Sequence, residues 1–496
     1  MSLKNYIDYI HTLLPADEWE AYESSYTTWV TRALTWSWHR PRMEVRSLLE
    51  CQWRSFTKPV FGVSKTHMYV DRVDKQIALG HHRAYQWGRY YIQESAASLP
   101  PSIIDYRADD VILDMCAAPW GKTAQLATSL LALGWSGFVV ANEIDNTRRS
   151  TLKETVTRMG LYNVTVSYRF CTRRADNYPT TFDHIIVDAV CSGEGTCFRT
   201  TEFMDQRWLW LTIKNSELQQ QMMSDAITCV KPWGSIVFST CTLNTNENEW
   251  VVAWVLENFS DLVELVPVEI EWSSPGLSGH GLSDEDCLKV ARLRPHIQHS
   301  GGFWVSKFIK KWWISRDANT VRPWTNNSFP KLSKKKKSSS STIEYKAQTK
   351  NTTISSLLSD FGITIPEHSR IYEDKWVIYL TTTRTLIWYE SGLPIFKIWR
   401  TQMTPLPALV PALWHRCNLP RVDLDDEQIQ QWMSSTELPL SQYPASPLSR
   451  GGGRRPEGFE ENSKDGEIKG RVIVTCHWSD VWLGKIGWWV LKNKMK

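Results

Sequence analysis

Several features that would mark a membrane protein, a secreted protein or a metal-stapled scaffold are missing from this sequence. Its 496 residues contain no run of 18 or more apolar residues, so we expect no membrane-spanning helix. The stretch from Met1 to Ile10 carries charges where a signal peptide needs apolar residues, which predicts a cytoplasmic protein. The ten cysteines include no Cys-x-x-Cys pair and no cluster with His at ligand spacing, so we expect neither a metal site nor disulfides.

Glycine is also scarce, whereas tryptophan is abundant. The chain has 25 Gly, about 5% against roughly 7% in an average protein, but 27 Trp. The 42% of apolar and 22% of charged residues are typical of a globular protein, and the length predicts two or three domains. The net charge of +4 is uneven, because residues 322–355 alone carry seven Lys and one Arg against one Glu. Only that segment has the composition of a nucleic-acid-binding tail.

Short apolar runs alternate with helix-length segments from about residue 96 onward. The runs lie at 111–114, 137–143, 164–168, 184–188 and 235–239, and the helical segments at 123–133, 147–159 and 217–230. This alternation predicts an α/β fold whose mostly parallel sheet is covered by helices on both faces. Residues 303–309 add a late strand after a Gly-Gly turn.

The composition divides the chain into four parts. Residues 1–95 form an N-terminal extension, 96–315 the α/β core, 316–355 a basic Lys/Ser linker and 356–496 a β-rich module. The run Lys334–Lys337 is followed by four serines, which favours a solvated linker over a tail that touches phosphates.

Ligands of an open parallel sheet bind beyond the carboxyl ends of its strands. A loop of small residues follows the first predicted strand, from Asp114 to Thr123, and Glu143 ends the second. A carboxylate there can accept from both hydroxyls of a ribose, so a nucleoside cofactor is favoured, although such a Glu caps a helix or pairs with Lys as often.

A phosphate-binding loop is the competing interpretation of Gly121-Lys122-Thr123, with Asp188 as the magnesium-binding acid. That motif needs a glycine where Cys116 stands, and Pro119 lacks the N–H that would hold a phosphate. An NTPase is therefore disfavoured.

Two further strand ends carry thiols. Asp188 and Cys191 follow the fourth run, and Cys241 follows the fifth. A single Cys in such a place is usually a small buried hydrophobe, but two thiols and an acid at one sheet edge favour chemistry.

These segments together resemble the motifs of the RNA cytosine-C5 methyltransferases of the Nop/Sun family. The resembling motifs are Cys116-Ala117-Ala118-Pro119-x-Gly121-Lys122, Asp188-Ala-x-Cys191-Ser-Gly-Glu-Gly195 and Ser239-Thr-Cys241-Thr242. The resemblance implies a Rossmann-like methyltransferase core, an N-terminal extension on the RNA side and a PUA-like RNA-binding module at the C-terminus. It also implies S-adenosylmethionine as cofactor, small-subunit (16S) ribosomal RNA as substrate and a monomer.

The resemblance assigns roles to individual residues. Cys241 would add to cytosine C6, Asp188 would contact the base near N3, and Cys191 would assist proton removal from C5 and product release. The cofactor pocket would be lined by Cys116, Ala117, Ala118, Pro119, Trp120, Gly121, Lys122, Thr123, Glu143 and Asp188.

Some positions depart from the family pattern. Trp120 and Trp233 stand where the family has Gly, Val190 replaces a Pro, and no acid follows Tyr168 until Asp176. A glycine used for close backbone approach cannot become Trp without a rearranged loop. The alternative hypothesis is therefore a non-catalytic RNA-binding or ribosome-assembly protein with a degenerate cofactor loop.

Overall fold

The computed structural model describes residues 3–25, 32–36, 67–70, most of 79–312 and a set of strands between 369 and 493. Short gaps within 79–312 include Pro119, Trp120, Asp176 and residues 197–207, and the linker 316–355 also lies outside the described residues. None of the helices in the described residues is long and apolar enough to cross a membrane.

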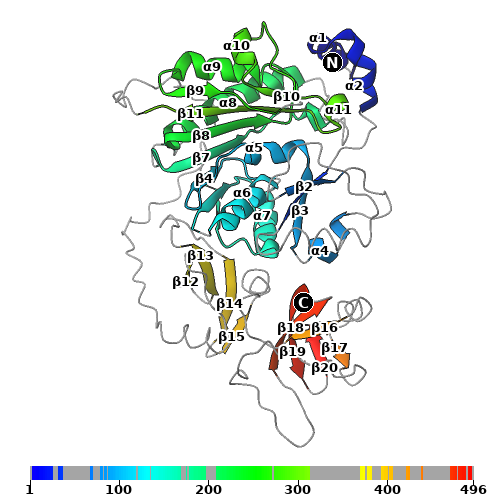
Figure 1. The fold of residues 1–496 in the computed structure, drawn as a ribbon, viewed down its shortest axis with the longest axis vertical. Coiled ribbons are helices and arrows are strands. Elements are labelled where there is room, and N and C mark those ends of the chain that lie inside the picture. Colours follow the sequence, from blue (N-terminus) through cyan, green and yellow to red (C-terminus); the bar gives the residue numbers. More distant parts are fainter. Residues whose placement is uncertain are drawn as a thin grey trace, which may run out of the picture.

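An eight-stranded sheet forms the centre of the molecule (Figure 1). Its strands are β4 (Val111–Asp114), β5 (Phe138–Asn142), β6 (Val164–Ser167), β7 (Phe182–Asp188), β8 (Val230–Thr240), β9 (Val263–Val266), β10 (Ala291–Leu293) and β11 (Phe303–Lys310). The order is β10-β11-β8-β7-β4-β5-β6, with β9 also paired to β11. The strands from β4 to β8 run parallel and β11 runs antiparallel to β8. The chain turns back between β4 and β7, where such sheets bind ligands.

Helices cover both faces of this sheet. They are α6 (Gly121–Leu133), α7 (Asn146–Met159), α8 (Trp208–Cys229) and α9 (Glu249–Phe259). Residues of β4 alternate between the two faces, because Ile112 packs with α6 and α7 whereas Leu113 packs with α8 and α9. Helix α7 begins where the Asp145 side chain accepts from the Arg148 N–H, and it ends at Gly160 with φ 67°. The predicted Rossmann-like core and its late strand are thus confirmed.

The N-terminal residues form a separate layer. It holds α1 (Leu3–Leu13), α2 (Trp19–Ser25) and an antiparallel sheet of β2 (His67–Val70), β1 (Arg32–Trp36) and β3 (Tyr90–Glu94), in the order β2-β1-β3. Short helices complete the described chain up to 312, namely α4 (Arg83–Gln86), α5 (Leu99–Ser102), α10 (Asp284–Cys287) and α11 (Pro295–Gln298). The Glu18 carboxylate joins this layer to the core, because it accepts from Arg294 Nη1 at 2.6 Å and lies 2.9 Å from His296 Nε2.

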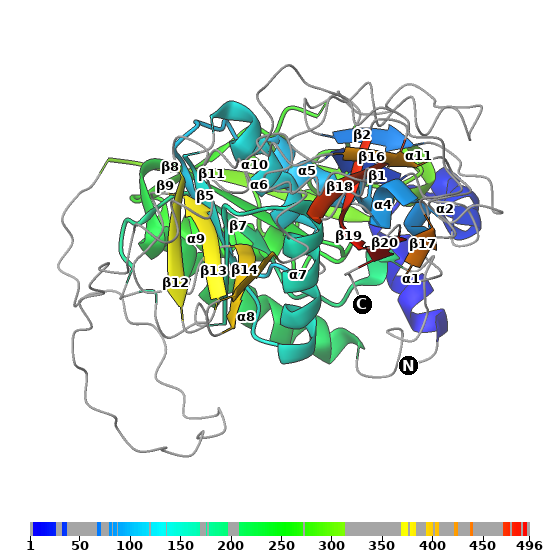
Figure 2. The same cartoon turned by 90° about the horizontal axis from the view of Figure 1, so that it is seen from below.

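The β-rich C-terminal part contains two sheets. The first is β12 (Ser369–Asp374), β13 (Val377–Thr382), β14 (Leu393–Trp399) and β15 (Gln402–Pro405). The second is β16 (Arg421–Leu424), β18 (Gly470–Cys476), β19 (Ser479–Gly487), β20 (Val490–Asn493) and β17 (Glu437–Pro439). The first sheet lies beside α7 (Figure 2), and its Leu380 and Leu393 are buried in the same core as that helix. The PUA-like character of this part stays a prediction.

Trp233 has a strained backbone within β8. Its φ is 65°, in the left-handed region that L residues with large side chains avoid, and its side chain is 66% exposed. The strand is irregular here, since Phe182 pairs with Val230 but His184 pairs with Ser235. The indole therefore offsets little of its backbone strain by packing.

Replacing this indole tests the strain. Trp233→Gly should raise the free energy of unfolding by about 1 kcal/mol, because glycine adopts positive φ without the steric cost. The measurement is urea unfolding followed by circular dichroism. Trp210→Gly is the matched control: Trp210 is 60% exposed on α8, where glycine should instead lower stability by about 1 kcal/mol. A loss of stability in Trp233→Gly would contradict the assignment of strain.

Candidate active site

Two thiols meet at the carboxyl edge of the sheet. Cys241 directly follows β8 and Cys191 lies three residues after β7. Their Sγ atoms are 3.3 Å apart, and both side chains are partly exposed and free of disulfides. The parallel pairing of β7 with β8 explains the meeting, because it places Asp188 opposite Ser239 and so brings the two following loops together. The sequence prediction that these thiols share one edge is confirmed.

The two thiols are not equivalent. The hydrogen bond with Cys241 and then burial raise the pKa of Cys191 well above its usual value, and the carboxylates of Glu247 and Glu194 add to this rise. Cys191 therefore stays a thiol near neutral pH. As a thiol it can donate to Cys241, the only one of the two that is placed directly at a strand end.

Asp188 is held from both sides at the end of β7. Its Oδ1 accepts from Ser239 Oγ at 2.8 Å, and its Oδ2 accepts from Lys122 Nζ at 2.7 Å. Burial lowers the pKa of Lys122, but the charge and hydrogen bond of Asp188 outweigh it, so the net pKa is raised. Lys122 also lies 5.4 Å from the Phe303 ring centroid. A lysine committed to a carboxylate in this way disfavours the phosphate-loop interpretation.

The loop after β4 has one open acceptor. Thr123 Oγ1 donates to Asp114 Oδ2 at 2.6 Å, whereas Asp114 Oδ1 is buried without a hydrogen-bond partner in the described part of the chain. Burial raises the pKa of Asp114 to about 7, against the hydrogen bond from Thr123. Burial and the neighbouring acids Asp114 and Asp188 likewise raise the pKa of Cys116. Asp114 Oδ1, beside a loop of small residues, could accept a hydrogen bond from a donor group of a bound cofactor.

Gly121 fixes how closely α6 approaches the N-terminal layer. A Cβ at this position would stand 2.2 Å from Oε1 of Gln93, on β3. A larger residue where this loop enters the helix would therefore have to displace the Gln93 side chain.

Glu143 is almost completely buried at the end of β5. One of its carboxylate oxygens accepts from the Asp145 N–H at 2.8 Å, and the other lies 3.4 Å from Arg148 Nη2. Arg148 also donates to the carbonyl oxygen of Ala118, at 3.3 Å. The guanidinium therefore links the loop after β4 to the loop after β5, and it orients the acid predicted to bind a ribose.

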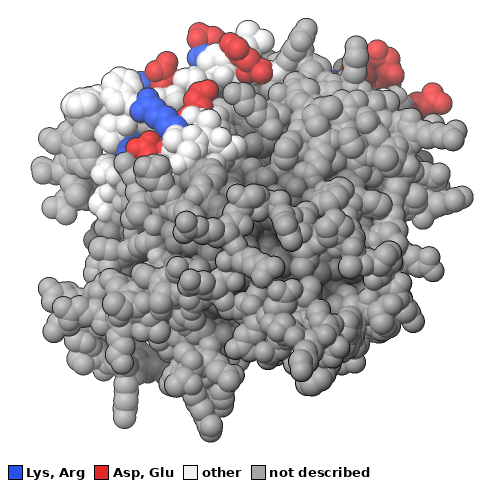
Figure 3. Space-filling view, turned by 60° about the horizontal axis from the view of Figure 1, so that its bottom comes forward, with Lys and Arg blue, Asp and Glu red and all other residues white. Residues whose placement is uncertain are grey.

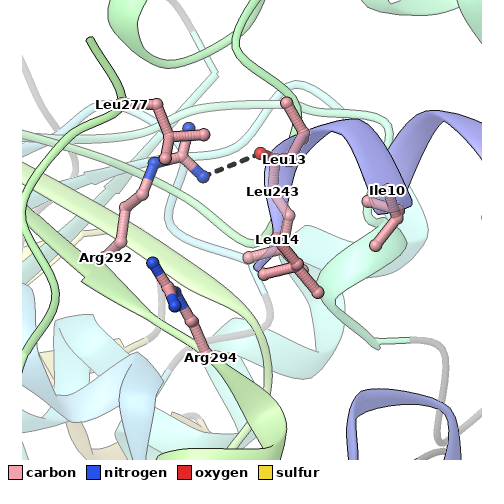
Figure 4. A pocket seen from close by; sticks show the side chains of 7 residues that line it. All are labelled: Ile10, Leu13, Leu14, Leu243, Leu277, Arg292 and Arg294. Atoms are coloured by element: carbon pink, nitrogen blue, oxygen red, sulfur yellow. Dashed lines mark hydrogen bonds between the residues drawn. The ribbon is translucent and has the colours of Figure 1, made fainter. Parts of the chain in front are cut away.

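The loop that carries Cys241 backs onto α1. Leu243 is buried with Ile10 and Leu13 of that helix, and these side chains line a small pocket with Arg292 (Figure 4). Arg292 Nη1 donates to the carbonyl oxygen of Leu243 at 2.7 Å. The N-terminal helix and a buried arginine thus hold the loop in place from behind.

Several buried side chains behind the thiols were not found by sequence reasoning. They are Ser192, Glu194, Gln219, Thr242, Asn244, Glu247 and Arg292. Glu194 follows Cys191 within the same motif, and Glu247 follows Cys241 by six residues, so acids close to both thiols were the available signal.

A family model for 16S rRNA methyltransferase RsmB/F matches residues 101–309, which span the whole edge described above. Residues 101–309 are thus similar to the RsmB/F methyltransferases. This match agrees with the resemblance in the sequence motifs, which implies S-adenosylmethionine as cofactor. The loop after β4, the open acceptor of Asp114 and the buried Glu143 fit that cofactor.

Similar proteins agree with this assignment. The ribosomal RNA small subunit methyltransferase F of Shewanella piezotolerans is 30% identical over 61% of this chain and 60% of its own. The Escherichia coli protein of that name is 32% identical over 49% of both chains. The chain thus spans about half to 60% of the length of these relatives. A methyltransferase homologue from Pyrococcus horikoshii is 27% identical, covers 60% of this chain and 92% of its own, and superposes with a TM-score of 0.51.

The ion pair behind the Cys241 loop gives a stability test. Arg292 and Glu249 are almost fully buried and form two hydrogen bonds, of 2.7 and 2.5 Å. Arg292→Ala should lower the free energy of unfolding by about 3–5 kcal/mol, because it leaves a buried carboxylate without its partner. Urea unfolding measures the loss. The double variant Arg292→Met, Glu249→Leu should recover most of it, and no recovery would contradict an origin in the unpaired charge.

Proposed function

We propose that the chain methylates carbon 5 of cytosine in small-subunit ribosomal RNA, with S-adenosylmethionine as donor and a covalent Cys241–C6 adduct. The observation that carries the proposal is the 3.3 Å contact between Cys191 and Cys241 beside Asp188. S-adenosylmethionine supplies the methyl group as a sulfonium. Carbon 5 needs activation to accept it, because an aromatic cytosine is a poor carbon nucleophile. Two thiols in contact can divide the work, one adding to the ring and the other removing a proton.

In the first half, the thiolate of Cys241 forms a bond to C6. The electron pair of the C5–C6 double bond then becomes available at C5, which takes the methyl group. Asp188, fixed by Ser239 and Lys122, lies at the same edge to contact the base near N3 and stabilise charge as the adduct forms.

In the second half, C5 loses its proton and the S–C6 bond breaks. The contact with Cys241 is the largest cause of the raised pKa of Cys191. Cys191, 3.3 Å from Cys241, is placed to release its own proton to solvent and, as a thiolate, to take the proton of C5. The C5–C6 double bond re-forms and Cys241 leaves as a thiolate.

The remaining assignments belong to the same proposal. Residues 1–95 would face the RNA, and residues 96–315 would hold the cofactor site and the cytosine site. Residues 316–355 would link this core to residues 356–496, which would bind RNA as a PUA-like module. In the small described part of the face shown in Figure 3, Lys and Arg side chains lie beside Asp and Glu side chains. We further propose a cytoplasmic monomer.

Cofactor binding tests the proposal against a non-catalytic RNA-binding protein. The wild-type chain should bind S-adenosylmethionine in isothermal titration calorimetry, and Glu143→Gln should weaken the affinity about 10–100-fold by removing charged acceptors for the ribose hydroxyls. Glu257→Gln, an exposed acid on α9, is the matched control and should bind normally. An absence of binding by the wild type would favour the RNA-binding alternative.

The two thiols should give variants that differ in kind. Cys241→Ala should bind RNA but form neither adduct nor product, because no other group activates the ring. Cys191→Ala should still form the adduct and stall there, leaving a protein–RNA band that survives denaturing electrophoresis. Two simply buried thiols would give no trapped species in either variant, and an adduct in Cys241→Ala would overturn the role assignment.

A further inference from the structure

Two carboxyl groups lie completely buried behind the thiols. Glu194 lies three residues after Cys191 and begins a single 3-10 turn (Glu194–Thr196), and Glu247 precedes α9. Ser192 Oγ contacts both acids, at Glu194 Oε2 and at Glu247 Oε1. The two acids come from the loops of the two different thiols, so the hydroxyl of Ser192 joins those loops.

The hydrogen bonds require a shared proton. Ser192 has one hydroxyl hydrogen, which can be donated to only one of the two carboxylates it contacts. Glu247 also accepts from the Ser192 N–H and from Gln219 Nε2 through its other oxygen, at 3.1 and 2.9 Å. A proton on Glu247 Oε1, donated to Ser192 Oγ, leaves the serine hydrogen for Glu194 Oε2 and completes a chain from Glu247 through Ser192 to Glu194. Two buried acids in contact with one oxygen thus hold one proton.

Among the residues that the structure describes, none forms an ion pair with Glu194 or Glu247 that would replace that proton. Burial and the charge of Glu194 raise the pKa of Glu247 to about 7, against the hydrogen bonds that it accepts. In the described part of the chain, Cys191 and, from α1, Tyr9 interact with the pair. The nearby Arg292 is already bound to a different acid, Glu249.

The pair also fixes the positions of the thiols. Asn244 donates its backbone N–H to Glu194 Oε1 at 2.9 Å and its side-chain NH₂ to both acids, at 2.7 and 2.9 Å. Ser192 Oγ lies 3.2 Å from Thr242 Oγ1, and these two residues directly follow Cys191 and Cys241. A third link joins the loops, since the Gly195 N–H donates to the carbonyl oxygen of Cys241 at 3.0 Å. Loss of the proton would leave two like charges in the middle of this clamp.

We propose that Glu194 and Glu247 act as a one-proton positioning pair that holds Cys191 and Cys241 in contact, and that removal of the shared proton separates the thiols. Neither acid touches the substrate. Their effect on catalysis rests on the function proposed above, but their effect on the distance between the thiols does not.

A bifunctional thiol reagent measures that distance without RNA or cofactor. Phenylarsine oxide binds two adjacent thiols with release of water, and competition with dithiothreitol at each pH corrects for thiol ionisation. The wild type should bind the arsenical at pH 6 and at least about 10-fold more weakly at pH 8.5, relative to dithiothreitol. Cys191→Ala and Cys241→Ala should lose chelation at both pH values, which shows that these two thiols form the site.

Neutral variants of the pair separate positioning from simple packing. Glu247→Gln removes the titrating charge and keeps the shape, so its relative affinity should be the same at pH 6 and pH 8.5. Glu257→Gln should behave like the wild type. If Glu247→Gln does not fold, Glu194→Gln takes its place, and the pH dependence of the wild type alone still decides. Wild-type binding that does not weaken between pH 6 and 8.5, or an unchanged pH dependence in the Gln variant, would overturn the proposal.

Methyl transfer gives a second readout that a structural role would not change. The rate of the wild type should fall as pH rises through about 7, whereas Glu247→Gln should keep its rate there. A normal arsenical result with no methyl transfer by any variant would sink the proposed function and leave the positioning pair intact.

Discussion

The hydrogen-bond register of the parallel strands is the constraint on which the site depends. The pairing of β4 with β7 puts Asp114 opposite Ile186, and the pairing of β7 with β8 puts Asp188 opposite Ser239. A slip by one residue would turn every side chain of a strand to the other face of the sheet. The acids would then enter the apolar layers, and the two thiols would no longer share an edge. Packing of the apolar residues on both faces therefore also specifies the geometry of the chemistry.

Charge is tolerated at this edge because almost every buried ionic group has a specific partner. Lys122 forms an ion pair with Asp188, and Arg292 forms one with Glu249. An isolated buried charge costs several kcal/mol, so these pairs leave little freedom for any one of them to change alone. Among the described residues, Glu194 and Glu247 behind the thiols form no ion pair, and elsewhere the buried Lys310 donates to two backbone carbonyl oxygens. Because the described residues behind the thiols include few counter-ions, burying the acids there costs free energy. For the same reason the protonation of these acids changes with pH.

Much of this organisation could be predicted from sequence, and the failures have physical causes. The alternation of apolar runs and helical segments predicted the bounds of the strand at 164–168 within one or two residues. The motifs at the strand ends identified both thiols and Asp188. The pattern missed Glu194 and Glu247, because an acid in a loop is normally solvated and only tertiary packing makes it buried. The sequence predicts that the C-terminal part is β-rich but not that its described strands pair as two sheets, since strand propensity does not encode which strands pair. The strain at Trp233 depends on a backbone angle that residue identity alone does not give.

The docking of α1 has a consequence for how the protein is made. Tyr9 contacts Thr245, 236 residues later in the chain, and Glu18 accepts from Arg294, 276 residues later. At roughly 5–20 residues per second, a ribosome needs on the order of 10–50 s to deliver those partners after α1 emerges. During that interval Ile10 and Leu13 of the first helix have Tyr22 of their buried cluster, but not Leu243, which is made later. The apolar side of α1 is therefore incompletely covered while the core is synthesised, and the Cys241 loop packs against this helix only when the two distant segments meet.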